Sequence, residues 1–116
     1  MRKGIIVIGL CLLSMVSFAS NYSFLNYSAI TYFTGKDEQL MVQTVDKALN
    51  SVPDGRKISW SNPQSGSWGF VVPSRTTTAN GLKCRNLKIF NSAKQVTGES
   101  NYRLCKFNDG WKIISN

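Results

Sequence analysis

The sequence predicts an α+β fold: one amphipathic helix packed on a four- to five-stranded antiparallel β-meander that carries one disulfide. Two observations lead to this prediction. The hydrophobic period changes from about 3.6 residues to about 2 near Gly55, which is typical of a helix followed by strands. Cys84 and Cys105 each lie in an alternating segment ahead of a turn, behind an export signal that would bring them into an oxidising compartment. We therefore expect a small β-rich domain stapled by a Cys84–Cys105 disulfide.

Residues 1–19 have the pattern of a signal peptide. A short positive segment, Arg2-Lys3, precedes an apolar run over 4–16 that contains no charge, and small residues form a cleavage site before Ser20. We expect export to the periplasm or the outer membrane, with release into the medium as a further outcome. A retained anchor is the alternative, although a membrane span needs about 20 apolar residues. Cys11 does not fit a lipoprotein signal, because a large apolar residue precedes it.

The composition is basic and points to anionic partners. The chain has 14 Lys and Arg against 6 Asp and Glu, and removal of residues 1–19 takes away two basic residues, which leaves 12 against 6, a net charge of +6. The expected partners are anionic envelope components, namely lipid headgroups, lipopolysaccharide or cell-wall polymer, or an envelope protein. Simple solubility explains the charge equally well. Nucleic acid is not an expected partner, because the sequence has no run of basic residues and an exported protein leaves the compartment that holds nucleic acid.

The segment over 20–36 is rich in aromatic residues and precedes the α+β domain proper, which is expected over 37–116. We expect this segment to be partly ordered, either as a strand laid on the domain or as a tether. Its aromatic residues are Tyr22, Phe24, Tyr27, Tyr32 and Phe33.

The helix is expected to begin at Thr34 or Asp37, whose side-chain oxygens can accept hydrogen bonds from the first backbone N–H groups. Asp37 and Glu38 also suit the positive end of the helix dipole. The Pro-Asp-Gly sequence over 53–55 ends the helix. The apolar stripe that would face the sheet consists of Met41, Val45, Ala48, Leu49 and Val52.

The first hairpin is expected to join a strand over 57–60 to a strand over 68–72. Its turn is dense in Ser, Asn, Pro and Gly. With the turn centred near Gln64, Trp60 would lie opposite Trp68, and Gly69 would leave the other face of the second strand bare.

Pro73 is expected to end the second strand, and a polar loop is expected from Ser74 to Asn80. A tight turn at Asn108-Asp109-Gly110 joins the last two strands. The three remaining strands are expected over 82–90, 102–107 and 111–114.

The cysteines also predict how the third and fourth strands pair. If Cys84 lies opposite Cys105, the connecting turn is centred between Lys94 and Gln95. A turn at Gly98 would separate the two cysteines, so we prefer the first register. A disulfide requires Cα atoms closer than about 7 Å. Closing a loop of about 20 residues stabilises a domain by roughly 3 kcal/mol.

The sequence carries no signature of an enzyme. It has no histidine, no glycine-rich phosphate loop, no metal-ligand spacing and no C-x-x-C motif. Its acidic residues are spread along the chain, and its serines lack a base. We therefore expect no catalytic residue, no cofactor and no metal site.

Basic residues gather on the third and fourth strands, beside the cysteines, and form a candidate anion-binding set. In the preferred register Lys88 and Arg103 share one face of the sheet. Lys83, Arg85 and Lys106 share the opposite face. An ordinary solvated face is the alternative explanation. The set consists of Lys83, Arg85, Lys88, Arg103 and Lys106.

Several short motifs follow one another in the order of a known domain. They are W-S-N-P-Q-S-G over 60–66, G-F-V-V-P over 69–73, Cys84-Arg85, Cys105-Lys106 and D-G-W over 109–111. With these motifs, most of the chain after the signal resembles the C-terminal domain of the 17 kDa surface antigen family of proteobacterial outer-membrane proteins. The resemblance implies an envelope location and no established catalytic activity.

The resemblance also implies structural roles for the motif residues. The chain departs from the family in lacking a lipoprotein signal and the glycine-rich segment ahead of this domain, so an outer-membrane anchor is not implied. The implied roles are turn formation by Asn62, Pro63 and Gly66, packing by Trp60 and Trp111, and the bridge between Cys84 and Cys105.

We therefore expect a non-catalytic exported module of the envelope or periplasm that acts by binding or structural support. The alternative is a small secreted inhibitor of a hydrolase, which would insert a protruding wedge such as Ser74 to Asn80 into an active site. An envelope module should fractionate with cells, whereas an inhibitor should reach the medium.

Overall fold

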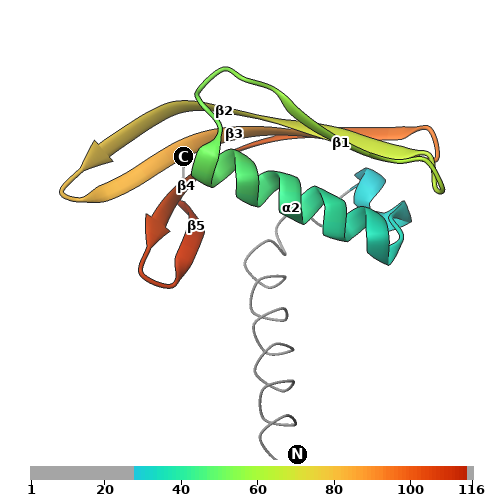
Figure 1. The fold of residues 1–116 in the computed structure, drawn as a ribbon, viewed down its shortest axis with the longest axis horizontal. Helices are drawn as coiled ribbons and strands as arrows, with labels where there is room; N and C mark the ends of the chain where they lie inside the picture. The colour runs from blue at the N-terminus through green and yellow to red at the C-terminus, as the bar shows by residue number, and fades with distance from the viewer. Residues whose placement is uncertain (1–27, 115–116) are drawn as a thin grey trace, which may run out of the picture.

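The computed structural model describes residues 28–114, and in it one helix packs on a five-stranded antiparallel sheet (Figure 1). The strands follow one another in sequence order across the sheet, which confirms the predicted meander. The elements are η2 (Ser28–Tyr32), α2 (Gly35–Ser51), β1 (Ile58–Asn62), β2 (Ser67–Ala79), β3 (Leu82–Ala93), β4 (Val96–Phe107) and β5 (Gly110–Ile114).

The helix α2 lies along one face of the sheet, called here the helix face (Figure 1). Its apolar stripe is buried as predicted, because residues at helical spacing point together toward the strands. No described helix has the length and hydropathy needed to cross a membrane. The core between the layers consists of Met41, Val45, Ala48, Leu49, Trp60, Val71, Leu87, Ile89, Leu104 and Trp111.

The sequence ahead of α2 also packs on this core. Over residues 28–32 it forms the 3₁₀ helix η2, so the described part is not the strand that we considered. Phe33 meets Trp60 edge to face, with ring centroids 5.3 Å apart. Tyr22, Phe24 and Tyr27, like the expected signal peptide, lie outside the described residues.

The first hairpin differs from its predicted register by one residue. Trp60 pairs with Gly69, and Trp68 pairs with Ser61. A one-residue shift turns side chains to the opposite face, so Trp60 is buried while Trp68 is 43% exposed. Gly69 therefore lies under the helix rather than on a bare face. A Cβ there would lie 2.7 Å from Trp60 Nε1, which explains the glycine.

The strand β2 runs through Pro73 to Ala79, so the predicted end at Pro73 and the predicted loop from Ser74 to Asn80 are both wrong. Pro73 is tolerated because β1 pairs with β2 only as far as Val71, which leaves an open edge beside the proline. Its carbonyl points to this edge and accepts a hydrogen bond from Gly55 N at 2.8 Å.

The predicted register of β3 and β4 is confirmed. Cys84 lies directly opposite Cys105, their Cα atoms are 4.0 Å apart, and the two residues form a disulfide. Lys94 and Gln95 form the turn with φ values of 50° and 68°. Two-residue hairpins favour such positive φ values because their twist matches that of the strands.

Candidate functional site

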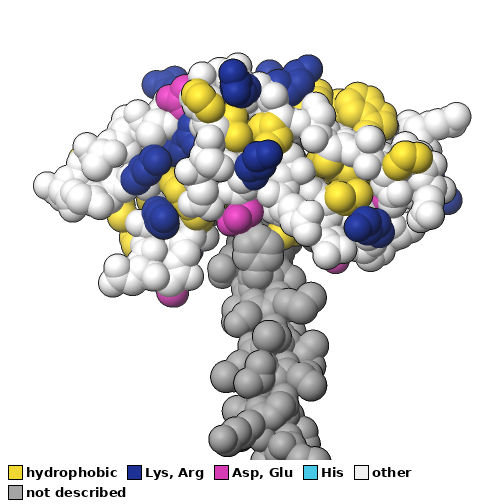
Figure 2. All heavy atoms as spheres, in the orientation of Figure 1, with side chains coloured by type: hydrophobic (Ala, Val, Ile, Leu, Met, Phe, Trp, Pro, Cys, Tyr) yellow, Lys and Arg dark blue, Asp and Glu magenta, His cyan; other side chains and the backbone are white. Residues whose placement is uncertain are grey.

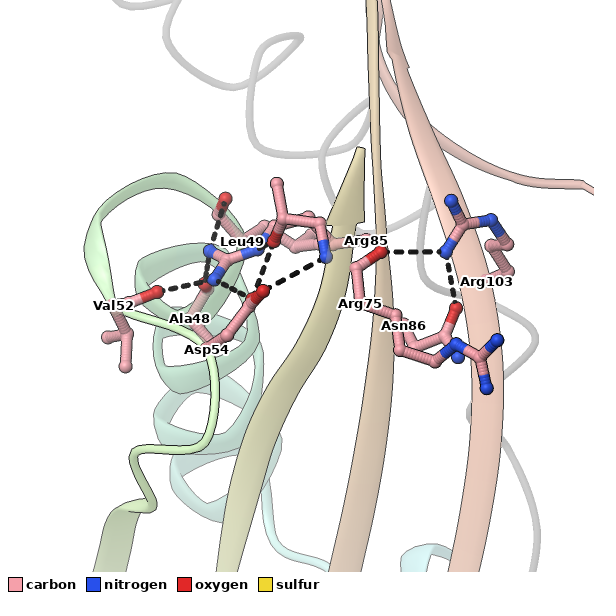
Figure 3. Close-up of polar contacts among 9 residues, drawn as sticks. Ala48, Leu49, Val52, Asp54, Arg75, Arg85, Asn86 and Arg103 are labelled. Atoms are coloured by element: carbon pink, nitrogen blue, oxygen red, sulfur yellow. Dashed lines mark hydrogen bonds and ion pairs between the residues drawn. The ribbon is translucent and has the colours of Figure 1, made fainter. Parts of the chain in front are cut away.

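The side chain of Arg85 reaches from β3 to the C-terminal end of α2 (Figure 3). Arg85 is only 4% exposed. Nη1 donates to the carbonyls of Ala48 and Leu49 at 2.7 and 3.2 Å, and Nη2 donates to that of Val52 at 2.6 Å. A cation at this end also complements the helix dipole.

Two further bonds complete the Arg85 cluster, which we define as Arg85, Asp54, Thr76 and the three helix carbonyls. Nε donates to Thr76 Oγ1 at 2.7 Å, and Nη2 donates to Asp54 Oδ1 at 2.8 Å. All five N–H groups of the guanidinium are thereby engaged. The hydrogen bonds from Arg85 and then Thr76 lower the pKa of Asp54 to about 2. Arg85 has no donor left for an external anion.

The N-terminal end of α2 is held by the Asp37 cluster, which we define as Asp37, Thr34, Asn62 and Ser65. Thr34 and Asp37 form a capping box, in which each side chain accepts from the backbone N–H of the other. Asp37 Oδ1 accepts from Asn62 Nδ2 and Ser65 Oγ, both at 2.7 Å. The cluster thus joins the start of the helix to the β1–β2 turn.

The pKa of Asp37 follows from these bonds. Burial raises it, but the hydrogen bonds from Thr34, Ser65, Asn62 and Ser67 together outweigh burial and lower the pKa to about 2. The carboxylate is therefore ionised at neutral pH although the residue is 0% exposed. Hydrogen bonds from neutral donors, together with the positive end of the helix dipole, stabilise this buried charge.

The motif residues occupy structural positions. Asn62 accepts from Gln64 N through its side chain and from Gly66 N through its carbonyl. Gly66 has a φ of 80°, which favours glycine. Pro63 lies between them in the exposed turn. Trp111 is 5% exposed and donates from Nε1 to Asn50 Oδ1 at 3.0 Å.

The pairing divides the rest of the predicted anion-binding set between the two faces. Lys83 has the same orientation as Arg85 and lines a hollow beside the end of α2, and Lys106 pairs with the buried Trp111. Lys88 and Arg103 lie on the face away from the helix, called here the outer face. Anion binding by these four residues remains a prediction.

The outer face carries an aromatic platform that we define as Trp68, Phe70 and Phe90. Phe70 and Phe90 stack with centroids 5.1 Å apart, and Trp68 meets Phe90 at the same distance. Lys57 Nζ lies 4.3 Å from the centroid of the Phe70 ring. Trp68 was predicted to lie opposite Trp60, and the one-residue difference in register instead places these two side chains on opposite faces of the sheet.

Two depressions continue from the platform along β2 and β3. The first, called the outer groove, has a volume of about 450 Å³, and its outward-facing lining residues are Val72, Ser74, Asn86, Lys88 and Asn101.

The second depression, called the arginine hollow, is lined by Arg75, Thr77, Asn86 and Arg103 and has a volume of about 350 Å³. Arg75 lies in an irregularity of β2 between Ser74 and Thr77, where it has a φ of 52°. Nη1 of Arg103 donates to Asn86 Oδ1 at 2.6 Å and to the carbonyl of Arg75 at 3.1 Å (Figure 3). No sequence pattern indicated this bulge.

The outer face combines exposed aromatic rings with positively charged side chains. Cys84 and Cys105 are oxidised. The described residues contain no group of three or more His, Cys, Asp or Glu side chains that could hold a metal ion. Figure 2 shows Lys and Arg side chains spread over the visible surface, with hydrophobic side chains between them. Such a surface can stack against a ligand and pair with its anionic groups.

Comparison with known proteins identifies the family. The family model described as "17 kDa outer membrane surface antigen" matches residues 47–110. The 17 kDa surface antigen of Rickettsia prowazekii is 32% identical over 84 residues, and that of Rickettsia conorii is 30% identical; each alignment covers 69% of this chain and 52% of the relative. The Rickettsia australis protein is 37% identical over 51 residues, which are 43% of this chain and 33% of the relative. No solved structure matches significantly.

The chain spans about half the length of these curated relatives. Their names denote surface antigens rather than enzymes, and they support an exported protein associated with the outer surface of the cell envelope. The predicted resemblance is confirmed: the chain belongs to the 17 kDa surface antigen family.

Proposed function

We propose that this protein is a non-catalytic module of the cell envelope that acts by binding through the outer face of its sheet. The observation that carries the proposal is the aromatic platform. Its Trp68 is 43% exposed, on a face that no described element covers. An exposed aromatic surface is costly to leave in water and typically marks a site of interaction.

The distribution of roles between the two faces supports this proposal. The helix face supplies the core, and the two buried charged side chains next to it, Asp37 of α2 and Arg85 of β3, are engaged in holding α2. The outer face adds little to that core, so its aromatic residues are available to a partner. Trp side chains in such surfaces commonly contribute much of the binding energy.

Sedimentation of the purified full-length protein with washed cell envelopes tests this function. Trp68→Ser should weaken binding by about tenfold, since it removes an exposed aromatic anchor. Tyr32→Ser is the matched control, because Tyr32 is 48% exposed but lies in η2 on the helix side. Thermal unfolding should show that both variants remain folded. Equal binding of Trp68→Ser and wild type would refute the outer face as the binding surface.

A further inference from the structure

We infer that the outer face binds an acidic polysaccharide strand, and specifically a cell-wall glycan strand that carries carboxylate groups. This inference rests on the proposed function and names its ligand. Three features in one line carry it: the aromatic platform, the outer groove and the arginine hollow.

The line is long enough for a chain molecule. It follows β2 from Trp68 to Ser74 and ends at the arginine hollow beside the bulge. Six residues of strand at about 3.3 Å each span about 20 Å. A compact ligand would occupy one depression, whereas a linear polymer can contact the platform, the groove and the hollow together.

Each feature matches one part of an acidic sugar. The platform presents flat ring faces, whose negative quadrupole attracts the C–H groups on one side of a sugar ring. The outer groove offers the amides of Asn86 and Asn101 and the hydroxyl of Ser74, which can exchange hydrogen bonds with sugar hydroxyls. Lys57 and Lys88 add positive charge beside the sugar path.

The arginine hollow supplies the position for a carboxylate. The two ion pairs found among residues 28–114 belong to Arg85 and Lys112, so neither Arg75 nor Arg103 is paired there with an acid. Two guanidinium groups lining one hollow repel each other, and an anion between them would remove that repulsion. A guanidinium group also holds a carboxylate with two parallel hydrogen bonds. Arg103 already donates to Asn86, to the carbonyl of Arg75 and to Thr77, so Arg75 would supply these two bonds and Arg103 mainly positive charge.

The charge of the surroundings agrees with an anionic ligand. The chain has six acidic residues, all within the described range. By strand register only Glu99, opposite Phe90, has the orientation of the outer face. A lipid surface fits less well, because the path beyond the platform consists of two depressions whose lining mixes apolar side chains with amides, hydroxyls and positive charges, whereas a membrane surface calls for a continuous apolar face.

Tryptophan fluorescence gives a direct test on the full-length protein. Trp68 is exposed, whereas Trp60 and Trp111 are 6% and 5% exposed, so a ligand on the platform should mainly perturb Trp68. The probe is a peptide-free glycan strand prepared from purified peptidoglycan, which carries lactyl carboxylates. Chitooligosaccharide is the neutral comparison, since it has the same type of backbone without the carboxylate. We expect the acidic strand to bind at least about tenfold more tightly, with affinity falling as salt rises.

Variants then locate the carboxylate. Arg75→Gln should weaken binding of the acidic strand about tenfold and leave binding of the neutral one unchanged. Arg56→Gln is the matched control, because Arg56 is exposed in the loop before β1. Equal affinities for the two oligosaccharides, or an acidic-strand affinity that Arg75→Gln does not change, would overturn the inference.

Two further probes separate this inference from the proposed function. They are vesicles of phosphatidylethanolamine with phosphatidylglycerol, and purified lipopolysaccharide. If either probe binds through Trp68 while the glycan strand does not, the inference of a glycan ligand is wrong, but the proposal that the outer face binds a partner is retained. If the glycan strand, the vesicles and the lipopolysaccharide all fail to bind, and washed envelopes do not retain the protein, then both the glycan inference and the proposed function are wrong.

Discussion

The two ends of α2 are fixed to the sheet by charges of opposite sign. At the N-terminal end a buried carboxylate, Asp37, accepts hydrogen bonds from neutral groups. At the C-terminal end a buried guanidinium, Arg85, donates to backbone carbonyls. Both charges suit the end of the helix dipole that they meet, and both tie the helix to a neighbouring strand or turn.

The difference lies in how the two buried charges are balanced. All the described partners of Asp37 are neutral, and the residue itself is fully buried. Arg85 has a counter-ion, Asp54, but the side chain of Asp54 is 43% exposed. We infer that the Asp37 cluster depends mainly on hydrogen-bond geometry. The stability that the Arg85 cluster contributes should in addition depend on salt, because the Asp54 carboxylate is exposed to solvent.

The largest expected effect comes from removing Arg85. Arg85→Met should lower the free energy of unfolding by about 3–5 kcal/mol, since it leaves several buried helix carbonyls without donors. Urea denaturation measures this loss. Lys83→Met is the matched control, because Lys83 is only two residues away on the same side of β3 and makes no contact to the helix carbonyls that Arg85 holds.

A small domain has only about 5–15 kcal/mol of stability, so Arg85→Met can fail to fold. Arg85→Lys then serves as the second variant. It keeps the charge but offers three donors in place of five, so a partial recovery of stability is expected. If Arg85→Met is as stable as Lys83→Met, the Arg85 cluster does not hold the helix.

The next largest effect concerns the disulfide beside the Arg85 cluster. Replacing Cys84 and Cys105 together by Ala should lower the free energy of unfolding by roughly 3 kcal/mol, because the closed loop no longer restricts the unfolded chain. Because Cys84 directly precedes Arg85, amide exchange should accelerate more at Ala48 and Leu49 than at the start of α2. Equal acceleration at both ends would show that the bridge is not coupled to one cluster.

Asp37→Asn should cost less, about 2 kcal/mol at neutral pH. The pKa of Asp37 is lowered from 3.8 to about 2 on folding. A lowered pKa stabilises the fold above the unfolded value of 3.8, and this contribution is lost as the pH falls through about 4 to 2. Acid unfolding of the variant should therefore be shallower than that of wild type over this window. A variant with the wild-type acid profile would contradict the ionised state of Asp37.

These two clusters also show what could be read from the sequence. Thr34 and Asp37 were predicted at the helix start, because a capping box has a local sequence signature. Arg85 was correctly assigned to the same face as Lys83, yet it was predicted to bind an external anion. Its carbonyl partners lie 33–37 residues away and have no side-chain signature, so the pattern could not reveal them.

The pairing of the strands could be predicted where side chains restrict the register. The cysteine pair correctly set β3 against β4, because a disulfide requires close Cα atoms. The β1–β2 turn permits neighbouring registers, and the one-residue error set Trp68 opposite Trp60 instead of on the other face of the sheet. The bulge that brings Arg75 beside Arg103 depends on long-range pairing. For these reasons most of the fold could be predicted, whereas the platform and the arginine hollow could not.

The smallest expected effect distinguishes the two clusters most directly. Asp54→Asn should lower the free energy of unfolding by less than about 1 kcal/mol, since an exposed ion pair contributes little. The pKa of Asp54 is also lowered to about 2, mainly by the hydrogen bond from Arg85. Its contribution is thus present above the ordinary value of 3.8 and is lost as the pH falls toward 2.

Salt provides the contrast between Asp54 and Asp37. Raising the ionic strength from about 0.05 M to about 0.5 M should shrink the cost of Asp54→Asn, because screening acts on an exposed pair. The cost of Asp37→Asn should stay nearly constant, because its partners are neutral and its carboxylate is buried. Denaturation of both variants at the two salt concentrations measures this difference. If salt reduces both costs equally, the two ends of α2 are held by the same kind of interaction and the distinction drawn between them is wrong.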